Sequence, residues 1–204
     1  MDDLPITIVS PLVHSEDEHA IVAVPSGESV KVIVAVQDQL KQIFGDAIWL
    51  TPPSGLHITI MEIICDTDYK DLSRKQHFVN WQEQYSQAAK DVIASFPSFS
   101  AMFNRLEVSQ RAIILKAADP KPFNEIRSRL LENIVLPQGT KLPPDIAHCT
   151  IARFNKPIDL DDAQSRAQAI ACNFTERIQV FKLLKDLGPP DFTPTLVDTY
   201  SLGG

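Results

Sequence analysis

The chain has 204 residues, of which 44% are hydrophobic and 22% are charged. A chain of this length and composition can bury a real hydrophobic core, which excludes disordered, collagen-like and coiled-coil proteins. The formal net charge is -7, and Lys and Arg form no cluster that could follow a long phosphate backbone, so we expect no binding to extended duplexes. A small local anion site is compatible with this charge.

Cysteine usage and the N-terminal sequence bear on the compartment. The three cysteines form no CxxC pair, and the start MDDLPITIVS lacks the basic region of a signal peptide. The longest apolar runs, such as VIVAV at 32–36, fall far short of the roughly 20 residues that a membrane helix needs. The glycine-rich GxGxxG and GxxxxGK[ST] phosphate loops are also missing. We therefore expect a cytoplasmic monomer that binds no membrane and needs no cofactor.

Strand and helix patterns alternate along the first half of the chain. Apolar residues recur at helical spacing from Gly27 to Phe44, and Gly45 supplies a C-terminal stop. A second helical pattern runs over 72–96 and ends at Pro97. Apolar and β-branched segments predict three strands, at 20–24, 47–50 and 56–64.

The second half continues this alternation. Two strand patterns, at 99–108 and 110–117, flank polar residues and predict an antiparallel hairpin. Helix signals follow at Asp119 and Pro120, and the cap Asp159 predicts a further helix over 160–174. Further strands are expected at 146–154, 177–184 and 195–202, with a loop at 136–144. Strands interspersed with amphipathic helices indicate the α+β class or a layered α/β class.

One nine-residue segment occurs twice. At an offset of 91 residues, PPSGLHITI at 52–60 aligns with PPDIAHCTI at 143–151, and Pro, Pro, His, Thr and Ile coincide. A single HxT triplet could arise by chance in a chain with five histidines. Two triplets that share a Pro-Pro approach and a following Ile indicate an internal duplication of a segment that leads into a strand.

Strand geometry gives the HxT triplets a meaning. Residues two apart project from the same face of a strand, so His57 and Thr59 point one way, and His148 and Thr150 do likewise. A lone histidine on a strand is usually a packed or surface residue, but two halves related by a pseudo-twofold axis would bring both pairs into one cleft. Cys149 then alternates toward the core and is not expected to be a nucleophile.

Two imidazoles and two hydroxyls suit phosphodiester chemistry. Imidazole has a pKa of about 6.5, so near neutral pH one ring can take a proton while the other gives one. One ring would activate water on one side of phosphorus, and the other would protonate the departing ribose oxygen opposite. The threonine hydroxyls would hold non-bridging oxygens, and this scheme requires no metal.

These motifs resemble those of the 2H phosphoesterases, the RNA ligase-like and 2',3'-cyclic phosphodiesterase group named for two HxT motifs. The resemblance covers nearly the whole chain and implies an α+β fold of two pseudo-symmetric lobes, each an antiparallel sheet with flanking helices, around a central cleft. Residues 1–204 would then form a single bilobal domain. The resemblance also implies metal-independent hydrolysis of cyclic phosphates by His57, Thr59, His148 and Thr150.

Two charged residues extend the duplicated motif. Arg153 matches the arginine of the HxTxxR form of the second motif, which relatives use near the substrate phosphate or base. Strict alternation would place it on the face opposite His148, so a substrate-binding role needs a bend or bulge in the strand. Glu62 lies 91 residues before Arg153, where many relatives have an apolar or aromatic residue. The alternative is that both are solvent-facing or paired structural charges.

The leading functional hypothesis is a phosphodiesterase that opens a 2',3'-cyclic phosphate, on an RNA end or a small nucleotide, to leave a 2'-phosphate. The alternatives are cleavage of 2',5'-linked oligonucleotides or of a cyclic phosphate on an ADP-ribose derivative, and a noncatalytic nucleotide-binding module. Four aromatic residues, Trp49, Phe103, Phe154 and Tyr200, could stack on a base or pack in the core. The remaining histidines, His14, His19 and His77, are expected to be structural or surface residues.

Overall fold

The computed structural model describes residues 6–9, 19–64, 74–136, 142–143, 145–188 and 192–204. Strands and helices alternate along these ranges, as the sequence patterns predict. The elements are β1 His19–Ala23, α1 Gly27–Phe44, η1 Gly45–Ala47, β2 Ile48–Leu50, η2 Pro53–Gly55, β3 Ile58–Ile64, α2 Arg74–Ala94, β4 Phe99–Val108, β5 Ala112–Ala117, α3 Lys121–Asn133, β6 His148–Phe154, α4 Leu160–Gln168, β7 Phe174–Ile178, β8 Val180–Lys185 and β9 Thr195–Ser201, where η marks a 3-10 helix.

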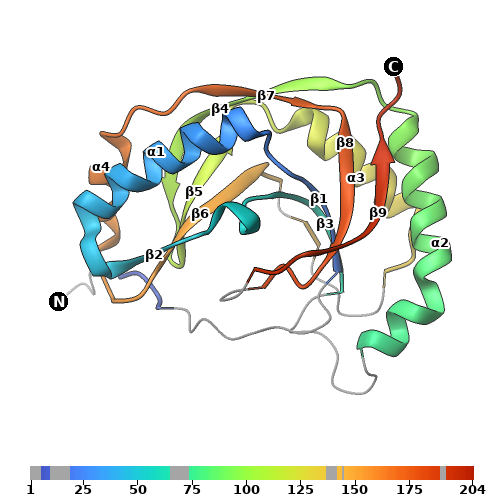
Figure 1. Ribbon diagram of the computed structural model, residues 1–204, viewed down its shortest axis with the longest axis horizontal. Coiled ribbons are helices and arrows are strands. Elements are labelled where there is room, and N and C mark those ends of the chain that lie inside the picture. Colours follow the sequence, from blue (N-terminus) through green and yellow to red (C-terminus); the bar gives the residue numbers. More distant parts are fainter. Residues whose placement is uncertain (1–5, 10–18, 65–73, 137–141, 144, 189–191) are drawn as a thin grey trace.

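The described strands form one curved antiparallel sheet (Figure 1). Its strand order is β7-β4-β5-β6-β3-β1-β8-β9, and β2 pairs separately with β6. The order divides between β6 and β3 into two groups of four strands. Strands that are distant in sequence, such as β1 and β8, therefore lie side by side.

The two groups meet at a single residue pair, Ile58 of β3 opposite Cys149 of β6. These two residues are 91 positions apart, which is the offset of the duplicated motif. A pseudo-twofold axis therefore passes through this pair. The fold class is α+β with two lobes, as expected, and the sheets of the two lobes are joined at the β3–β6 junction.

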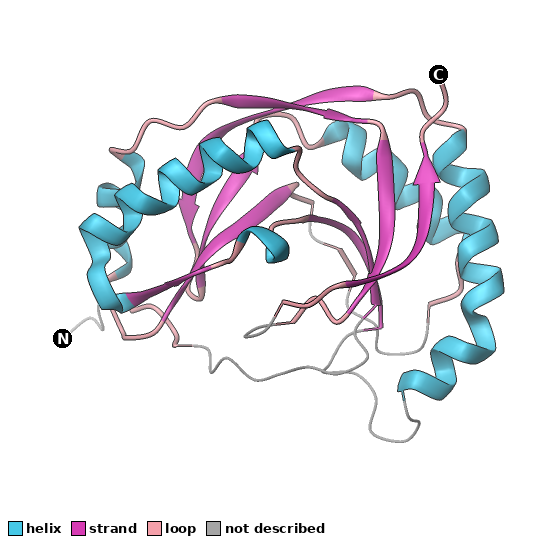
Figure 2. Cartoon of the chain, in the orientation of Figure 1, coloured by secondary structure: helices cyan, strands magenta, loops and turns pink. Residues whose placement is uncertain are grey.

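The helices of each half pack against the strands of the other half's motif. Helix α1 precedes β3 in the chain but contacts β2, β6 and β7, whereas α3 precedes β6 but contacts β3 and α2. Figure 2 shows α2 along one side of the sheet and α1 and α4 along the other. The cap of α1, Ser26, is fixed by the buried Glu176 carboxylate, which accepts hydrogen bonds from its backbone N (2.9 Å) and Oγ (3.0 Å). None of the helices in the described ranges is long and apolar enough to cross a membrane.

Buried apolar side chains fall into two clusters. The main core contains Ile21, Ile58, Ile60 and Ile151, together with the inward faces of the helices. A small second cluster consists of Ala20, Val22, Leu184 and Leu187. Because Ile21 belongs to the first cluster and its neighbours Ala20 and Val22 to the second, the two clusters lie on opposite faces of the sheet.

Two sequence predictions of secondary structure are wrong. The helix expected over 160–174 ends at Gln168, and Phe174 instead begins β7, where it pairs with Phe103 and stacks on its ring at 5.2 Å. The strand expected over 177–184 is divided at Gln179 into β7, which pairs with β4, and β8, which pairs with β1 and β9. Pairing with distant strands overrides the local periodicity in both cases.

Candidate active site

A bulge in β6 places Arg153 on the same face as His148 and Thr150. Thr150 lies opposite Ile114 but Ala152 lies opposite Ile113, so Ile151 is an extra residue in β6. Burial agrees with this reversal of faces after Ile151. His148, Thr150 and Arg153 are partly exposed, while the other four residues of the strand are buried. The bulge that a substrate-binding role for Arg153 requires is therefore present.

The same bulge occurs in β3. Thr59 lies opposite Val22 but Met61 lies opposite Ile21, so Ile60 is the extra residue. Ile60 is the duplicate of Ile151, and the bulge turns Glu62 to the same face as Thr59. We call this face of the sheet, which carries His57, Thr59, Glu62, His148, Thr150 and Arg153, the motif face.

Each bulge is held by a buried side chain from a helix. Gln37 of α1 donates from Nε2 to the carbonyls of Ile151 (2.8 Å) and Thr51 (2.7 Å). Arg127 of α3 donates to the carbonyls of Ile60 (3.1 Å) and Thr59 (2.7 Å). The bulge carbonyls of Ile60 and Ile151 thus keep hydrogen-bond partners although they are buried.

Sequence analysis missed Gln37 and Arg127, although a signal exists. Both residues occupy inward positions of an amphipathic helix: Gln37 lies four residues after Ile33, and Arg127 lies four residues after Phe123. A polar side chain within such a stripe needs buried hydrogen-bond partners. The pattern could have identified the two residues but not the carbonyls to which they bind.

A tight turn orients His57. Its Nδ1 lies 2.7 Å from the carbonyl oxygen of Gly55, the last residue of η2, so Nδ1 carries a proton and donates it to that carbonyl. A Cβ at Gly55 would collide with the ring of Phe192, which explains the glycine. Burial lowers the pKa of His57, while the hydrogen bond to Gly55 raises it. Nε2 is left as the reactive nitrogen of this ring.

His148 has a different environment at the equivalent position. The carbonyl two residues earlier, that of Ile146, accepts a hydrogen bond from Nη1 of Arg127 (3.0 Å). Nδ1 of His148 is buried and makes no hydrogen bond of good geometry within the described residues, although the Ile146 carbonyl is near enough to raise the pKa of the ring. Burial first, and then the positive charge of Arg127, lower the pKa of His148 to about 4. This imidazole is therefore neutral near pH 7.

The histidines and Arg153 are close enough to interact electrostatically. The charge of His57 lowers the pKa of His148, and the charge of Arg153 lowers the pKa of His57. Continuing the antiparallel register by one residue from the Ile58–Cys149 pair places His57 beside Thr150, and His148 beside Thr59. The motif face thus brings the five predicted site residues around the pseudo-twofold axis. They could surround one phosphate group with two imidazoles, two hydroxyls and a guanidinium.

An ion pair that the sequence did not indicate lies next to His148. Lys116 of β5 is directly opposite His148, and its Nζ lies 3.0 Å from the Glu107 carboxylate of β4. Both side chains are partly buried. Only the register of the β4–β5 hairpin with β6 brings this pair to the motif face, so no local pattern could have predicted it.

One of the four candidate aromatic residues reaches the motif face. Phe103, Phe154 and Tyr200 are each at most 1% exposed and belong to the main core. Trp49 is partly exposed, lies opposite Arg153 in the β2–β6 pair, and stacks on Phe192 at 5.4 Å. Trp49 is the candidate of the four that a ligand could reach.

The other residues considered from sequence have structural surroundings. Cys149 is buried in the core, and burial raises the pKa of its thiol to about 12. His19 is buried and stacks on Phe78 at 3.6 Å. His14 lies outside the described residues, and the structure does not describe the side chain of His77. Within the described ranges, no group of three or more His, Cys, Asp or Glu side chains could hold a metal ion.

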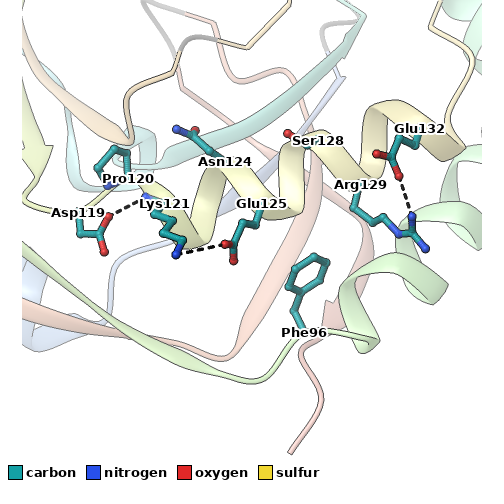
Figure 3. Close-up of a pocket in the computed structure, with 9 residues that line it drawn as sticks. All are labelled: Phe96, Asp119, Pro120, Lys121, Asn124, Glu125, Ser128, Arg129 and Glu132. Atoms are coloured by element: carbon teal, nitrogen blue, oxygen red, sulfur yellow. Dashed lines mark hydrogen bonds and ion pairs between the residues drawn. The ribbon is translucent and has the colours of Figure 1, made fainter.

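An open hollow of about 510 Å³ lies elsewhere, along α3 (Figure 3). None of the predicted site residues lines it. Four of its charged side chains form ion pairs, Lys121 with Glu125 and Arg129 with Glu132. This hollow carries no chemistry that the sequence motifs predict.

The duplicated motifs and their shared face can be compared with known families. The family model described as the 2'-5' RNA ligase superfamily matches residues 51–184, which include both HxT motifs. The chain belongs to the 2'-5' RNA ligase superfamily. This membership confirms the expected relation to the 2H phosphoesterases. No curated protein sequence matches the chain significantly.

Solved structures of the superfamily's fold cover nearly all of this chain. The TT0787 protein of Thermus thermophilus is 16% identical, with a TM-score of 0.63 over 92% of this chain and 98% of its own. LigT of E. coli, complexed with phosphate, is 13% identical, with a TM-score of 0.64 over 93% and 100%. The PDE domain of MHV ns2 is 15% identical, with a TM-score of 0.55 over 83% and 99%. At these identities the likeness shows the two-lobed fold.

Proposed function

We propose that this chain is a metal-independent phosphodiesterase that opens a 2',3'-cyclic phosphate, on an RNA end or a small nucleotide, to leave a 2'-phosphate. The observation that carries this proposal is the arrangement of both HxT pairs and Arg153 around the pseudo-twofold axis. Crystals of the related LigT hold phosphate in one case and 3'-AMP in another, which supports a phosphate-bearing nucleotide as substrate.

The surroundings of the two imidazoles support different roles. A general base must be neutral before it accepts a proton from water, and the pKa of about 4 keeps His148 neutral. A general acid must hold a proton: burial lowers the pKa of His57, and the hydrogen bond from its Nδ1 to Gly55 opposes this shift without reversing it, so the negative charge of a bound phosphate would be needed to keep the ring protonated. His148 therefore activates water, and His57 protonates the departing ribose oxygen on the opposite side of phosphorus.

The remaining site residues bind the charge that develops on the phosphate. Thr59 and Thr150 donate hydroxyl hydrogen bonds to non-bridging oxygens, one from each strand at the junction. Arg153 adds a guanidinium at the β2 end, where Trp49 offers an aromatic face for the base. Lys116 lies opposite His148, and its pairing with Glu107 limits its pull on the phosphate.

A single-turnover assay on a 2',3'-cyclic mononucleotide tests the proposal. We expect a nucleoside 2'-phosphate as product, with activity retained in EDTA. Turnover of 2',5'-linked oligonucleotides or of an ADP-ribose cyclic phosphate, with no activity on cyclic mononucleotides, would replace this substrate assignment. Binding of nucleotides without turnover of any of them would instead identify a noncatalytic module.

A further inference from the structure

The two ends of the motif face carry opposite charges. Glu62 and Arg153 are 91 residues apart, and matching bulges turn both toward this face. Because β3 and β6 are antiparallel, the pseudo-twofold axis sends the two residues in opposite directions from the junction. Arg153 lies toward β2, and Glu62 lies toward β1 and β8. A phosphate bound at the axis therefore has a guanidinium on one side and a carboxylate on the other.

Glu62 has no ion-pair partner among the described residues. Glu62 lies opposite Ala20 of β1, and Ala20 in turn lies opposite Leu184 of β8. Ala20 and Leu184 both belong to the small apolar cluster. Glu62 is partly buried, and it makes no hydrogen bond or ion pair with any other described residue. Lys182 lies opposite Val22 in the neighbouring row and therefore on the same face, and it forms no ion pair with Glu62 among the described residues.

A partly buried carboxylate without a partner among the described residues gains nothing from burial, and a ligand that donates hydrogen bonds would stabilise it. Apolar neighbours weaken dielectric screening, which strengthens the repulsion of a second anion and the attraction of hydrogen-bond donors. At the opposite end of the motif face, the positive charge of Arg153 attracts a second phosphate.

We infer that Glu62 is a specificity-determining residue that excludes a second phosphate from the β1–β8 end of the site and accepts hydrogen bonds from hydroxyl or amino groups there. The inference rests on the proposed function, because it assumes that the scissile phosphate sits at the pseudo-twofold axis. The preferred substrate class has one phosphate at the axis and carries any further phosphate at the Arg153 end only. A terminal cyclic phosphate satisfies this condition, and an internal linkage with phosphates on both sides does not.

Dinucleotides joined by one 2',5'-phosphodiester separate the two ends. A ligand with one terminal phosphate can place it beside Arg153. A ligand with a phosphate at both termini must place one of them beside Glu62. Affinity for the unphosphorylated, singly and doubly phosphorylated dinucleotides can be measured by titration calorimetry. The His57→Ala background keeps all ligands intact.

Three variants complete the experiment. All variants are made in the His57→Ala protein, which is the parent for comparison. Glu62→Gln keeps the shape of the side chain and removes its charge, and Glu62→Arg places a guanidinium at both ends of the motif face. Glu125→Gln on the outer side of α3 is the control, because it changes the net charge equally outside the motif face. We expect the parent to bind the doubly phosphorylated ligand about tenfold or more weakly than the singly phosphorylated one, as expected for like charges in contact. Glu62→Gln should abolish this difference, Glu62→Arg should reverse it, and Glu125→Gln should preserve it.

Equal parental affinity for the two phosphorylated ligands would overturn the inference, as would a Glu62→Gln effect that is the same for all three ligands. Circular dichroism confirms that each variant is folded. Calorimetry needs no turnover, so a failure to hydrolyse cyclic phosphates would overturn the proposed function alone. Absence of binding by all three dinucleotides would overturn the inference alone, because the assay on a cyclic mononucleotide tests the proposed function separately.

Discussion

The two halves of the motif face share a backbone plan and differ in their charges. Each half contains a strand with an HxT pair and a bulge at the residue after the threonine, and a helix side chain from the other half of the sequence holds the bulge carbonyl. In the first half that side chain is Arg127, and the strand carries Glu62 beyond the bulge. In the second half it is Gln37, and the strand carries Arg153 beyond the bulge.

The shared backbone sets the positions of the site residues, and the differing side chains set their charges and hydrogen bonds. Duplication supplies two equivalent positions around one axis, which suits a phosphate approached from opposite sides. Substitution at a few positions then makes the two histidines unequal: the Gly55 carbonyl lies 2.7 Å from Nδ1 of His57, whereas the equivalent Ile146 carbonyl beside His148 also accepts a hydrogen bond from Arg127. The symmetric parts should therefore respond alike to mutation, and the asymmetric parts should not.

The largest expected effect follows loss of either imidazole. His57→Ala and His148→Ala should each lower the rate of the chemical step by roughly 10²–10⁴-fold, because a positioned acid or base contributes that much. A substrate with a leaving group of much lower pKa should rescue His57→Ala more than His148→Ala, since only the acid acts on the leaving oxygen. Wild-type rates in either variant, or rescue in the reverse order, would contradict the assigned roles.

Thr59→Val and Thr150→Val test the symmetric part of the comparison. Each removes one hydroxyl donor with little change in shape, so kcat should fall by about 10²-fold in both, and by similar factors. The midpoint of thermal unfolding should barely change, because both side chains are partly exposed. Full activity with a lowered midpoint would show that the threonines are structural.

The two bulge-holding side chains should differ in their effect on stability. Arg127→Met removes donors from the carbonyls of Thr59, Ile60 and Ile146 and should cost about 3 kcal/mol in unfolding free energy. Gln37→Leu should cost about 1 kcal/mol, because the Ile151 carbonyl still accepts from the Thr51 N–H at 2.9 Å. Urea denaturation measures both. A larger loss of unfolding free energy in Gln37→Leu than in Arg127→Met would contradict this prediction.

The last expected effect is on the pH dependence of stability. The folded pKa of His148, about 4, lies below its ordinary value of 6.5, so as pH falls the unfolded chain takes up this proton first. Unfolding free energy should therefore decrease between pH 6.5 and 4, and His148→Gln should make that decrease smaller. NMR titration of the ring checks the cause directly. A His148 that titrates near its ordinary pKa would show that neither burial nor Arg127 affects it.

The sequence by itself determined the element order, the α+β class and the duplicated HxT motif. These features are local: apolar residues at helical spacing specify α1 over Gly27–Phe44, and an identical Pro-Pro approach marks both motif strands. Strand alternation was also enough to direct Cys149 to the core and the two HxT pairs to one face. The sequence indicated that Arg153 needed a bulge but could not show that one exists.

Tertiary structure decided the rest. Whether Ile60 and Ile151 form bulges depends on pairing with β1 and β5, and those bulges alone set the faces of Glu62 and Arg153. The division of 177–184 into two strands likewise depends on partners at opposite ends of the sheet. Gln37 and Arg127 find their carbonyl acceptors 114 and 67 residues away. Strand register and buried hydrogen bonds are long-range properties, because the groups that satisfy them come together only when the chain folds.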